Sequence, residues 1–153
     1  MKSQKLKVKE LNKKHSFEFR ELTTIFQSEF GINETYNLKK SKIKNLLKKN
    51  DLHVIMIKKQ KEIIGGLTIY VLESYFHKNP IAYLYDIAIK REFQQQGLGS
   101  LLLTYTKEFC AKKGYSELFI QADKKDSKAI EFYRKNLPDN ESEVIHFTYL
   151  PKS

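Results

Sequence analysis

The most informative stretch of the sequence is YDIAIKREFQQQGLGSLLL, residues Tyr85–Leu103. In it an apolar run precedes three glutamines and a Gly-Leu-Gly, and a leucine-rich helical pattern follows. Glycine tolerates a positive φ and lets the backbone approach a ligand closely, so Gly97 and Gly99 predict a tight turn where a helix begins. A helix N-terminus presents unpaired N–H groups and about half a positive charge. Such a turn can therefore wrap an anionic phosphate.

Two better-known phosphate-binding motifs do not fit this turn. A Rossmann fingerprint needs a third glycine at the position that Leu102 occupies, and a P-loop needs Gly-Lys-Ser/Thr, which the sequence lacks. Dinucleotide and nucleoside-triphosphate binding are therefore disfavoured. The spacing alone is equally compatible with glycines that merely begin a packed helix.

Outward from this stretch, the sequence predicts one mixed sheet with helices. Period-two alternation and β-rich composition indicate strands, and apolar residues at helical spacing indicate helices. The expected strands cover residues 6–11, two runs within 52–72 around a turn at 58–61, 81–89, 116–122 and 144–150; the expected helices cover 15–30, 38–49, 97–113 and 126–136. The run at 81–89 is too apolar for an edge strand and is expected to be central. A mostly antiparallel front followed by an alternating βαβ back predicts the α+β class.

Length and composition fit one folded domain over residues 1–153. Hydrophobic residues make up 41% of the chain, which is enough for one substantial core. Cys110 is the single cysteine, so no internal disulfide can form, and the N-terminal residues lack the apolar core of a secretory signal. No apolar run reaches the roughly 18 residues that a membrane span needs. We therefore expect a cytoplasmic protein with no membrane partner.

The net charge of +10 favours an anionic partner, either nucleic acid or a phosphorylated cofactor. Nine lysines lie between residues 38 and 61, where Asp51 is the single acid. A nucleic-acid-binding module is therefore one hypothesis. These lysines are not regularly interleaved with aromatic residues, however, and a lysine-rich helix usually presents a solvated face. We therefore expect no nucleic-acid partner.

The neighbours of the glycine turn resemble the GNAT N-acetyltransferase superfamily over most of the chain. Its phosphate-binding pattern, Gln/Arg-x-x-Gly-x-Gly/Ala, stands here as QQQGLG, and its later Asn-x-x-Ala with a tyrosine four residues on stands as DSKA followed by Tyr133. The resemblance implies a GNAT fold, with a mixed, mostly antiparallel central sheet flanked by helices, and acetyl-CoA as cosubstrate. The residues expected to contact acetyl-CoA are Ile87, Ala88, Ile89, Gln94, Gln95, Gln96, Gly97, Leu98, Gly99, Ser100, Asp126, Ala129 and Tyr133.

A closer resemblance is to the gentamicin-type aminoglycoside 3-N-acetyltransferases. The segments EFGINETY, IIGGLTIYVLESYF, YLYDIAI, YSELFIQAD and EVIHF look like successive signatures of that subfamily, spread from Glu29 to Phe147. This resemblance implies acetylation of the 3-amino group of an aminoglycoside. Ile32 and Thr148 stand where the subfamily has acids. A polyamine, another small amine or a protein lysine therefore remains an alternative acceptor.

The same resemblance assigns the chemical roles. Transfer of an acetyl group from a thioester needs a neutral amine, a polarised carbonyl and a proton for the leaving thiolate. Asp86 interrupts an apolar run and matches the subfamily's acid, so it is the expected base, acting directly or through water. Tyr133 is the expected proton donor to the thiolate, and the backbone N–H groups of residues 87–89 would hold the carbonyl. The residues alone favour a satisfied strand-end carboxylate for Asp86, and a helix-core aromatic is a common alternative for Tyr133; the resemblance is what favours the chemical roles.

The acceptor is expected to be a polyamine-like small molecule with several ammonium groups. Its expected contacts are Glu29, Asp86, Asp123 and Glu143. Each of these acids taken singly is more commonly a solvated surface charge. One cysteine and scattered histidines give no metal-ligand spacing, so no metal is expected. Direct attack on acetyl-CoA in a ternary complex is the expected mechanism, a GNAT fold that only senses CoA is a rival, and a homodimer is compatible with the sequence.

Overall fold

The computed structural model describes residues 5–33 and 38–152, so part of the EFGINETY motif lies outside the described residues. The described chain divides into two compact units. The first unit ends at Gln121, and the second begins at Ala122.

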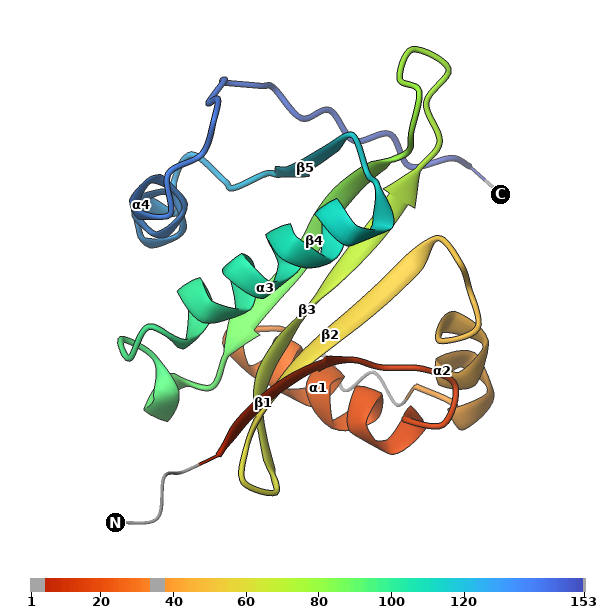
Figure 1. The fold of residues 1–153 in the computed structure, drawn as a ribbon, viewed down its shortest axis with the longest axis vertical. Helices are drawn as coiled ribbons and strands as arrows, with labels where there is room; N and C mark the ends of the chain where they lie inside the picture. Colours follow the sequence, from red (N-terminus) through yellow and green to blue (C-terminus); the bar gives the residue numbers. More distant parts are fainter. Residues whose placement is uncertain (1–4, 34–37, 153) are drawn as a thin grey trace. The chain divides into compact units, whose positions relative to one another are not determined.

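The first unit is built on a sheet that has five strands in the described residues (Figure 1). The strands are β1 (Leu6–Glu10), β2 (Leu52–Lys59), β3 (Glu62–Leu72), β4 (Ile81–Ile89) and β5 (Glu117–Ile120); the helices are α1 (Ser16–Glu29), α2 (Lys40–Leu46) and α3 (Leu98–Lys113), with a short 3₁₀ turn at Arg91–Phe93. The strand order is β1-β2-β3-β4-β5, and all neighbours are antiparallel except β4 and β5. The α+β prediction is confirmed, and β4 is an interior strand as its apolar sequence predicted.

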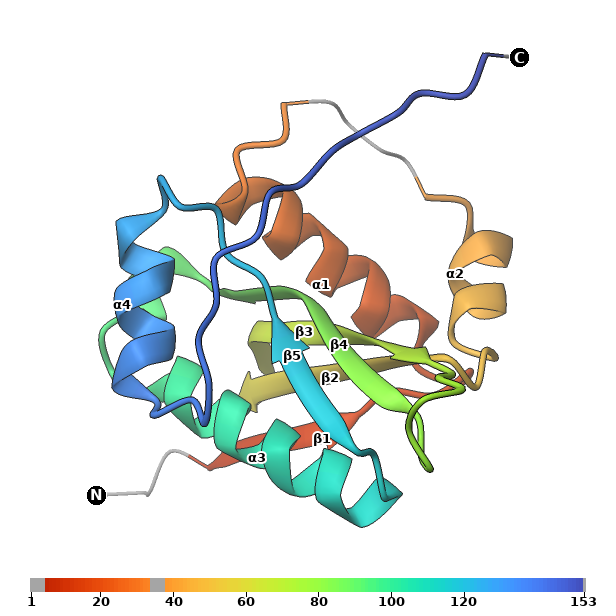
Figure 2. The same cartoon turned by 90° about the horizontal axis from the view of Figure 1, so that it is seen from above.

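Helices cover both faces of this sheet. Figure 2 shows α1 on one side of the strands and α3 on the other. The core on the α1 side consists of Leu11, Phe19, Leu22, Ile25, Phe26, Ile43, Leu52, Val54, Met56, Ile63 and Ala88. Toward the opposite face, α3 buries Leu98, Leu102, Leu103, Thr106 and Cys110. Each large apolar side chain buried in this way contributes about 1.5–3 kcal/mol, which is why two amphipathic patterns suffice to position the helices.

Two consecutive glycines in β3 allow the backbone of the sheet to pack closely. A Cβ atom on Gly66 would lie 2.5 Å from the carbonyl oxygen of Ile55 and 2.8 Å from a methyl group of Leu22. A Cβ atom on Gly65 would overlap the carbonyl oxygen of Ala88 in β4. Both positions therefore exclude any side chain.

The second unit contains one helix in its described residues, α4 (Ser127–Lys135). Asp126 caps this helix, because its Oδ1 accepts a hydrogen bond from the N–H of Ala129 at 3.0 Å. Arg134 makes a two-pronged ion pair with Glu141, with an Nη2–Oε1 distance of 2.5 Å. The predicted helix over residues 126–136 is confirmed.

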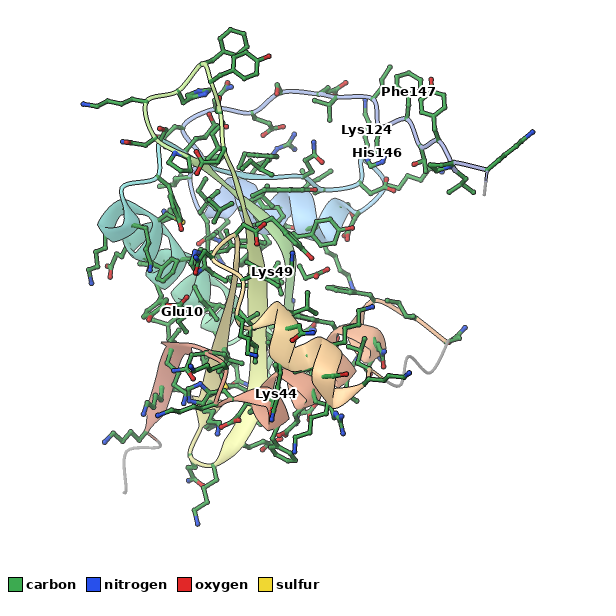
Figure 3. All side chains as sticks on the ribbon, turned by 90° about the vertical axis from the view of Figure 1, so that its right-hand side faces the viewer. Glu10, Lys44, Lys49, Lys124, His146 and Phe147 are labelled. Atoms are coloured by element: carbon green, nitrogen blue, oxygen red, sulfur yellow. The ribbon has the colours of Figure 1, made fainter. Side chains whose placement is uncertain are left out.

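The predicted last strand, residues 144–150, is wrong for this structure. The segment is not paired in a β-ladder, and its large apolar side chains are 65–87% exposed. His146 and Phe147 lie on this segment (Figure 3). Alternating composition shows that a segment is able to form a strand, but a strand also needs a partner whose backbone groups are free.

Candidate active site

An extra residue in β4 lies at the centre of the candidate site. Across the β3–β4 ladder Thr68 pairs with Asp86, but the next residue of β3, Ile69, pairs with Leu84. Tyr85 is therefore unmatched and forms a β-bulge. A bulge bends its strand and increases the local twist, so the direction of β4 changes immediately before Asp86.

Beyond the bulge, β4 separates from β5. The two strands pair in parallel only over Ile81–Leu84 and Glu117–Ile120, so residues 85–89 have no partner on that side in the described chain. The N–H of Lys90 donates to the carbonyl oxygen of Ile64 in β3. Because backbone groups alternate sides along an antiparallel strand, the N–H groups of Ile87 and Ile89 point away from β3, toward the open side.

This geometry refines the expectation for residues 87–89. The N–H of Ala88 lies on the β3 side, where Ala88 is the partner of Gly66. Two of the three expected donors, those of Ile87 and Ile89, are therefore directed where a ligand carbonyl could accept from them. Over this part of β4 the described chain leaves that side of the strand unpaired.

Asp86 is held by a reciprocal contact with Thr68. The Oγ1 of Thr68 donates to Oδ2 of Asp86 at 3.0 Å and accepts from the N–H of Asp86 at 3.3 Å. Burial raises the pKa of the Asp86 carboxyl above its usual value, and the hydrogen bond from Thr68 partly opposes that rise. A half-buried carboxylate with a raised pKa is a stronger base than an exposed one, which suits proton removal from an ammonium group.

The glycine turn has the shape that the sequence predicts. Gly97 has a φ of 76° and begins α3, and Gln95 also has a positive φ of 60°. No side chain caps this helix, and the first intrahelical backbone bond runs from the N–H of Leu101 to the oxygen of Gly97. The N–H groups of residues 98–100 are therefore free of intrahelical partners and suit an anionic ligand.

The side chains of Gln94 and Glu29 make hydrogen bonds that fix the loop leading into the glycine turn. The Nε2 of Gln94 donates to the carbonyl oxygen of Ile89 at 2.8 Å and to Oε2 of Glu29 at 3.0 Å. Oε1 of Glu29 accepts from the N–H of Arg91 at 3.2 Å. The structure thus gives both side chains a role in fixing the loop between β4 and α3. The side chain of Gln96 donates to the carbonyl oxygen of Glu92 in the same loop.

The remaining expected residues belong to the second unit. Tyr133 is half-buried, and burial together with the nearby Asp126 carboxylate raises the pKa of its phenol to about 12. Oδ1 of Asp123 accepts from the N–H of Lys125 at 2.8 Å, and Glu143 pairs with Lys124 at 3.1 Å. The Tyr133 phenol therefore stays protonated at neutral pH, and its raised pKa makes it a weaker acid than an ordinary tyrosine.

A separate cavity of about 440 Å³ lies at the C-terminal end of α3, whereas the glycine turn lies at its N-terminal end. On its wall the ring of His53 bridges Glu10 and Tyr115, with Nδ1 2.6 Å from Oε1 of Glu10 and Nε2 2.6 Å from the tyrosine oxygen. Glu10 and Lys49, both labelled in Figure 3, line it from β1 and from the segment after α2. No residue of the predicted site lines this cavity.

Other chemistries find little support in the described residues. In residues 5–33 and 38–152, no three His, Cys, Asp or Glu side chains are grouped in the way that a metal site requires. The Cys110 thiol is buried, and burial raises its pKa to about 11, which makes it a poor nucleophile. Within the described part of the chain, no helix combines the length and apolar composition needed to cross a bilayer.

Sequence reasoning missed Thr68, which contacts the expected base directly. Threonine is common in strands, so a threonine in a β-rich run does not by itself indicate a functional residue. Its importance depends on the register that places it opposite Asp86, and that register is a property of two paired strands.

Comparison with known proteins places this arrangement in a family. The family model described as the acetyltransferase (GNAT) family matches residues 19–137. A search of curated proteins found no match. Among solved structures, the aminoglycoside acetyltransferase meta-AAC0020 from an uncultured soil metagenomic sample is 37% identical, with a TM-score of 0.93 over 96% of this chain and 97% of that one, in complexes with trehalose and with sisomicin.

More distant structures share the fold. The aminoglycoside acetyltransferase HMB0005, also from an uncultured soil metagenomic sample, is 28% identical, with a TM-score of 0.88 over 97% of this chain and 99% of that one. The aminoglycoside N-acetyltransferase AAC(6')-Iy, in complex with a bisubstrate analogue, is 14% identical with a TM-score of 0.79 over 96% and 99% of the two chains, and shows the fold alone. The GNAT fold that the family resemblance implied is thereby confirmed. The chain belongs to the acetyltransferase (GNAT) family and is an acyl-CoA-dependent N-acetyltransferase.

Proposed function

We propose that the protein transfers the acetyl group of acetyl-CoA to the 3-amino group of an aminoglycoside by direct attack in a ternary complex. The observation that carries this proposal is the bulge at Tyr85, which places Asp86 beside a strand edge with free N–H groups. The acceptor class is supported by the 37% identical relative, which is an aminoglycoside acetyltransferase with a sisomicin complex.

The described donor set fits the cosubstrate. Acetyl-CoA supplies an activated acetyl thioester, and its pyrophosphate is anionic. The free N–H groups of residues 98–100 and the positive φ of Gly97 suit that anion. At a helix N-terminus the unpaired N–H groups and the partial positive charge of the helix dipole both attract an anion. We assign the wider contact set of residues 94–100 to the same group, with Gln94 and Gln96 shaping the loop.

Proton transfer and carbonyl polarisation fall to separate residues. An alkyl ammonium with a pKa of about 10.4 must lose its proton before it can attack. Asp86 accepts that proton, directly or through water, and attracts the ammonium before the reaction. The N–H groups of Ile87 and Ile89 donate to the acetyl carbonyl. Loss of one such donor typically lowers kcat by about 10²- to 10³-fold.

In the second unit, Tyr133 donates a proton to the departing thiolate, and the Asp126–Ala129 cap fixes the start of the helix that carries it. Asp123 and Glu143 are proposed contacts for further ammonium groups of the acceptor. Because the family pattern runs from the first unit into the second, we propose that both units serve one catalytic domain.

Thiol release decides the proposal. Purified protein is incubated with acetyl-CoA and a panel of sisomicin-type and gentamicin-type aminoglycosides, and free CoA thiol is followed. We expect acceptor-dependent release, and mass spectrometry with NMR of the product should place the acetyl group on the 3-amino nitrogen. Release of CoA thiol only with polyamines or with lysine peptides would show that the acceptor is not an aminoglycoside. No release of CoA thiol with any amine would overturn the proposed activity.

A further inference from the structure

Four aromatic rings form a continuous row across β3, β4 and β5. Tyr70 meets Tyr85 edge to face at a centroid distance of 5.4 Å, and Tyr85 meets Tyr83 in the same way at 5.6 Å. Tyr83 stacks on Phe119 at 4.5 Å with an interplanar angle of 4°. We call these four residues the aromatic row. No expected site residue belongs to it.

Strand register places the row on the face of the sheet that carries Asp86. Tyr70 pairs with Tyr83, and Tyr83 pairs with Phe119, so these three side chains share one face. Thr68, the partner of Asp86, is two residues before Tyr70 on the same strand and therefore lies on the same face. The row and the expected base are thus neighbours on one surface.

Two of the four rings are exposed to solvent, and the rings of Tyr83 and Phe119 are partly buried. Tyr85 is 60% exposed and Tyr70 is 39% exposed. A ring that served only to stabilise the sheet would contribute most if it were buried. Tyr85 instead lies on the bulge, and its exposed ring contacts that of Tyr83. The hydroxyl of Tyr83 donates to Oε1 of Gln121 at 3.1 Å, which fixes the ring plane.

The charge of Asp86 reaches the row. Besides burial, the Asp86 carboxylate raises the pKa of the Tyr70 phenol above its usual value, and Tyr85 followed by Asp86 does so for Tyr83. These rings therefore remain neutral and present electron-rich faces beside a carboxylate. Aromatic faces attract cations, and an adjacent anion strengthens the field that a cationic ligand meets.

We propose that the aromatic row binds a second, cationic sugar ring of the acceptor by stacking and cation–π contacts while Asp86 receives the amine that reacts. This inference rests on the proposed function and adds to it the surface that recognises a multi-ring acceptor. The occupant is an aminosugar because its C–H faces match the rings and its ammonium groups match the carboxylate. A neutral aromatic ligand would gain nothing from Asp86.

The test separates binding of the second ring from chemistry. Tyr85→Leu removes the ring at the centre of the row, Tyr70→Leu removes its neighbour, and Tyr85→Phe keeps the ring without its hydroxyl. Phe17→Leu is the matched control, because Phe17 is an aromatic residue of α1 that is 74% exposed and outside the row. Each variant is measured with sisomicin, with the single-ring acceptor 2-deoxystreptamine, and for acetyl-CoA affinity.

We expect Tyr85→Leu to raise KM for sisomicin about 5- to 30-fold, the range that a cation–π contact supports, with kcat changed less than about twofold. KM for 2-deoxystreptamine and the Kd for acetyl-CoA should stay unchanged, and Tyr85→Phe should restore most of the sisomicin affinity. Tyr70→Leu should show the same pattern, so the test survives if one leucine variant is too unstable to purify.

Two different failures can be told apart. If the unmodified protein acetylates sisomicin but both leucine variants keep their KM, or if KM for the single-ring acceptor rises equally, the aromatic row is not the second-ring site. If the unmodified protein acetylates no aminoglycoside, the proposed function fails and the inference fails with it.

Discussion

Thr68 and Asp86 face each other across the β3–β4 ladder, and the threonine Oγ1 donates a hydrogen bond of 3.0 Å to the carboxylate Oδ2. This contact favours the ionised carboxylate, whereas burial opposes it. The basicity of Asp86 is therefore set by two opposing effects, one of which a single substitution removes.

Thr68→Val should move the pH dependence of turnover. Without the hydroxyl, the pKa of Asp86 rises further, because a hydrogen bond to the charged form has been lost. A base acts only when it is deprotonated, so the acidic limb of the kcat/KM profile should shift to higher pH. Thr68→Ser keeps the donor and should leave the limb in place. An unshifted limb in Thr68→Val would show that Asp86 is not the base.

Asp86→Asn should separate activity from stability. We expect turnover to fall about 10²- to 10⁴-fold, the usual contribution of a positioned base, while acetyl-CoA affinity is kept. Burial raises the pKa of Asp86 in the folded protein, so the protein loses stability as the pH rises from the usual pKa of the carboxyl to the raised pKa, and the loss is complete above it. The variant should therefore melt at the same temperature as the unmodified protein or higher at pH 7. Retained turnover would instead favour a CoA-sensing role.

Gly66→Ala should destabilise the first unit by about 1–3 kcal/mol, because the new methyl group would lie 2.5 Å from the carbonyl oxygen of Ile55. Urea denaturation measures the loss. Gly31→Ala is the control, since nothing lies within 4 Å of its Cβ position and only its φ of +66° is strained. A smaller loss at Gly66 than at Gly31 would contradict the close approach of β2 and β3.

Glu10→Gln should reveal a pH-dependent part of the stability. The hydrogen bond from His53 lowers the pKa of Glu10 below its usual value of 4.5. Its stabilisation is therefore fully present above pH 4.5 and is lost as the pH falls through the lowered pKa of the folded state. Glu10 is partly exposed, so we expect a loss of at most about 1 kcal/mol at pH 6 that shrinks below pH 4.5.

Urea denaturation at the two pH values checks this prediction, with Glu108→Gln on the exposed side of α3 as the control. A difference that stays constant down to pH 3 would show that the carboxylate is not what His53 stabilises.

The parts of the fold that follow from local pattern were predictable. The run at 81–89 became β4 with the same ends, and the leucine-striped helix between Gly97 and Gly114 became α3, because burial and glycine turns both act locally. The bulge at Tyr85 was not predictable, since an unmatched residue exists only relative to the partner strand. The strand expected at 144–150 failed for a related reason: its pattern carried no information about a partner.

The same reasoning applies within the candidate site. Asp86 and the glycine turn became candidates through their resemblance to a family pattern, and the order of residues along the chain is enough to reveal such a pattern. Thr68 and the aromatic row did not, because tyrosines and threonines are ordinary strand residues until the register brings them together.

The bulge also has a genetic consequence. With Tyr85 removed, Leu84 and Asp86 would become neighbours, and the inward and outward alternation of β4 would run unbroken from Tyr83 to Ile89. An in-frame loss of that one codon would therefore keep the regular alternation of the strand while removing the bend on which the open strand edge depends. The regular pairing of β4 with β3 and the bend at the candidate site thus differ in this gene by a single triplet.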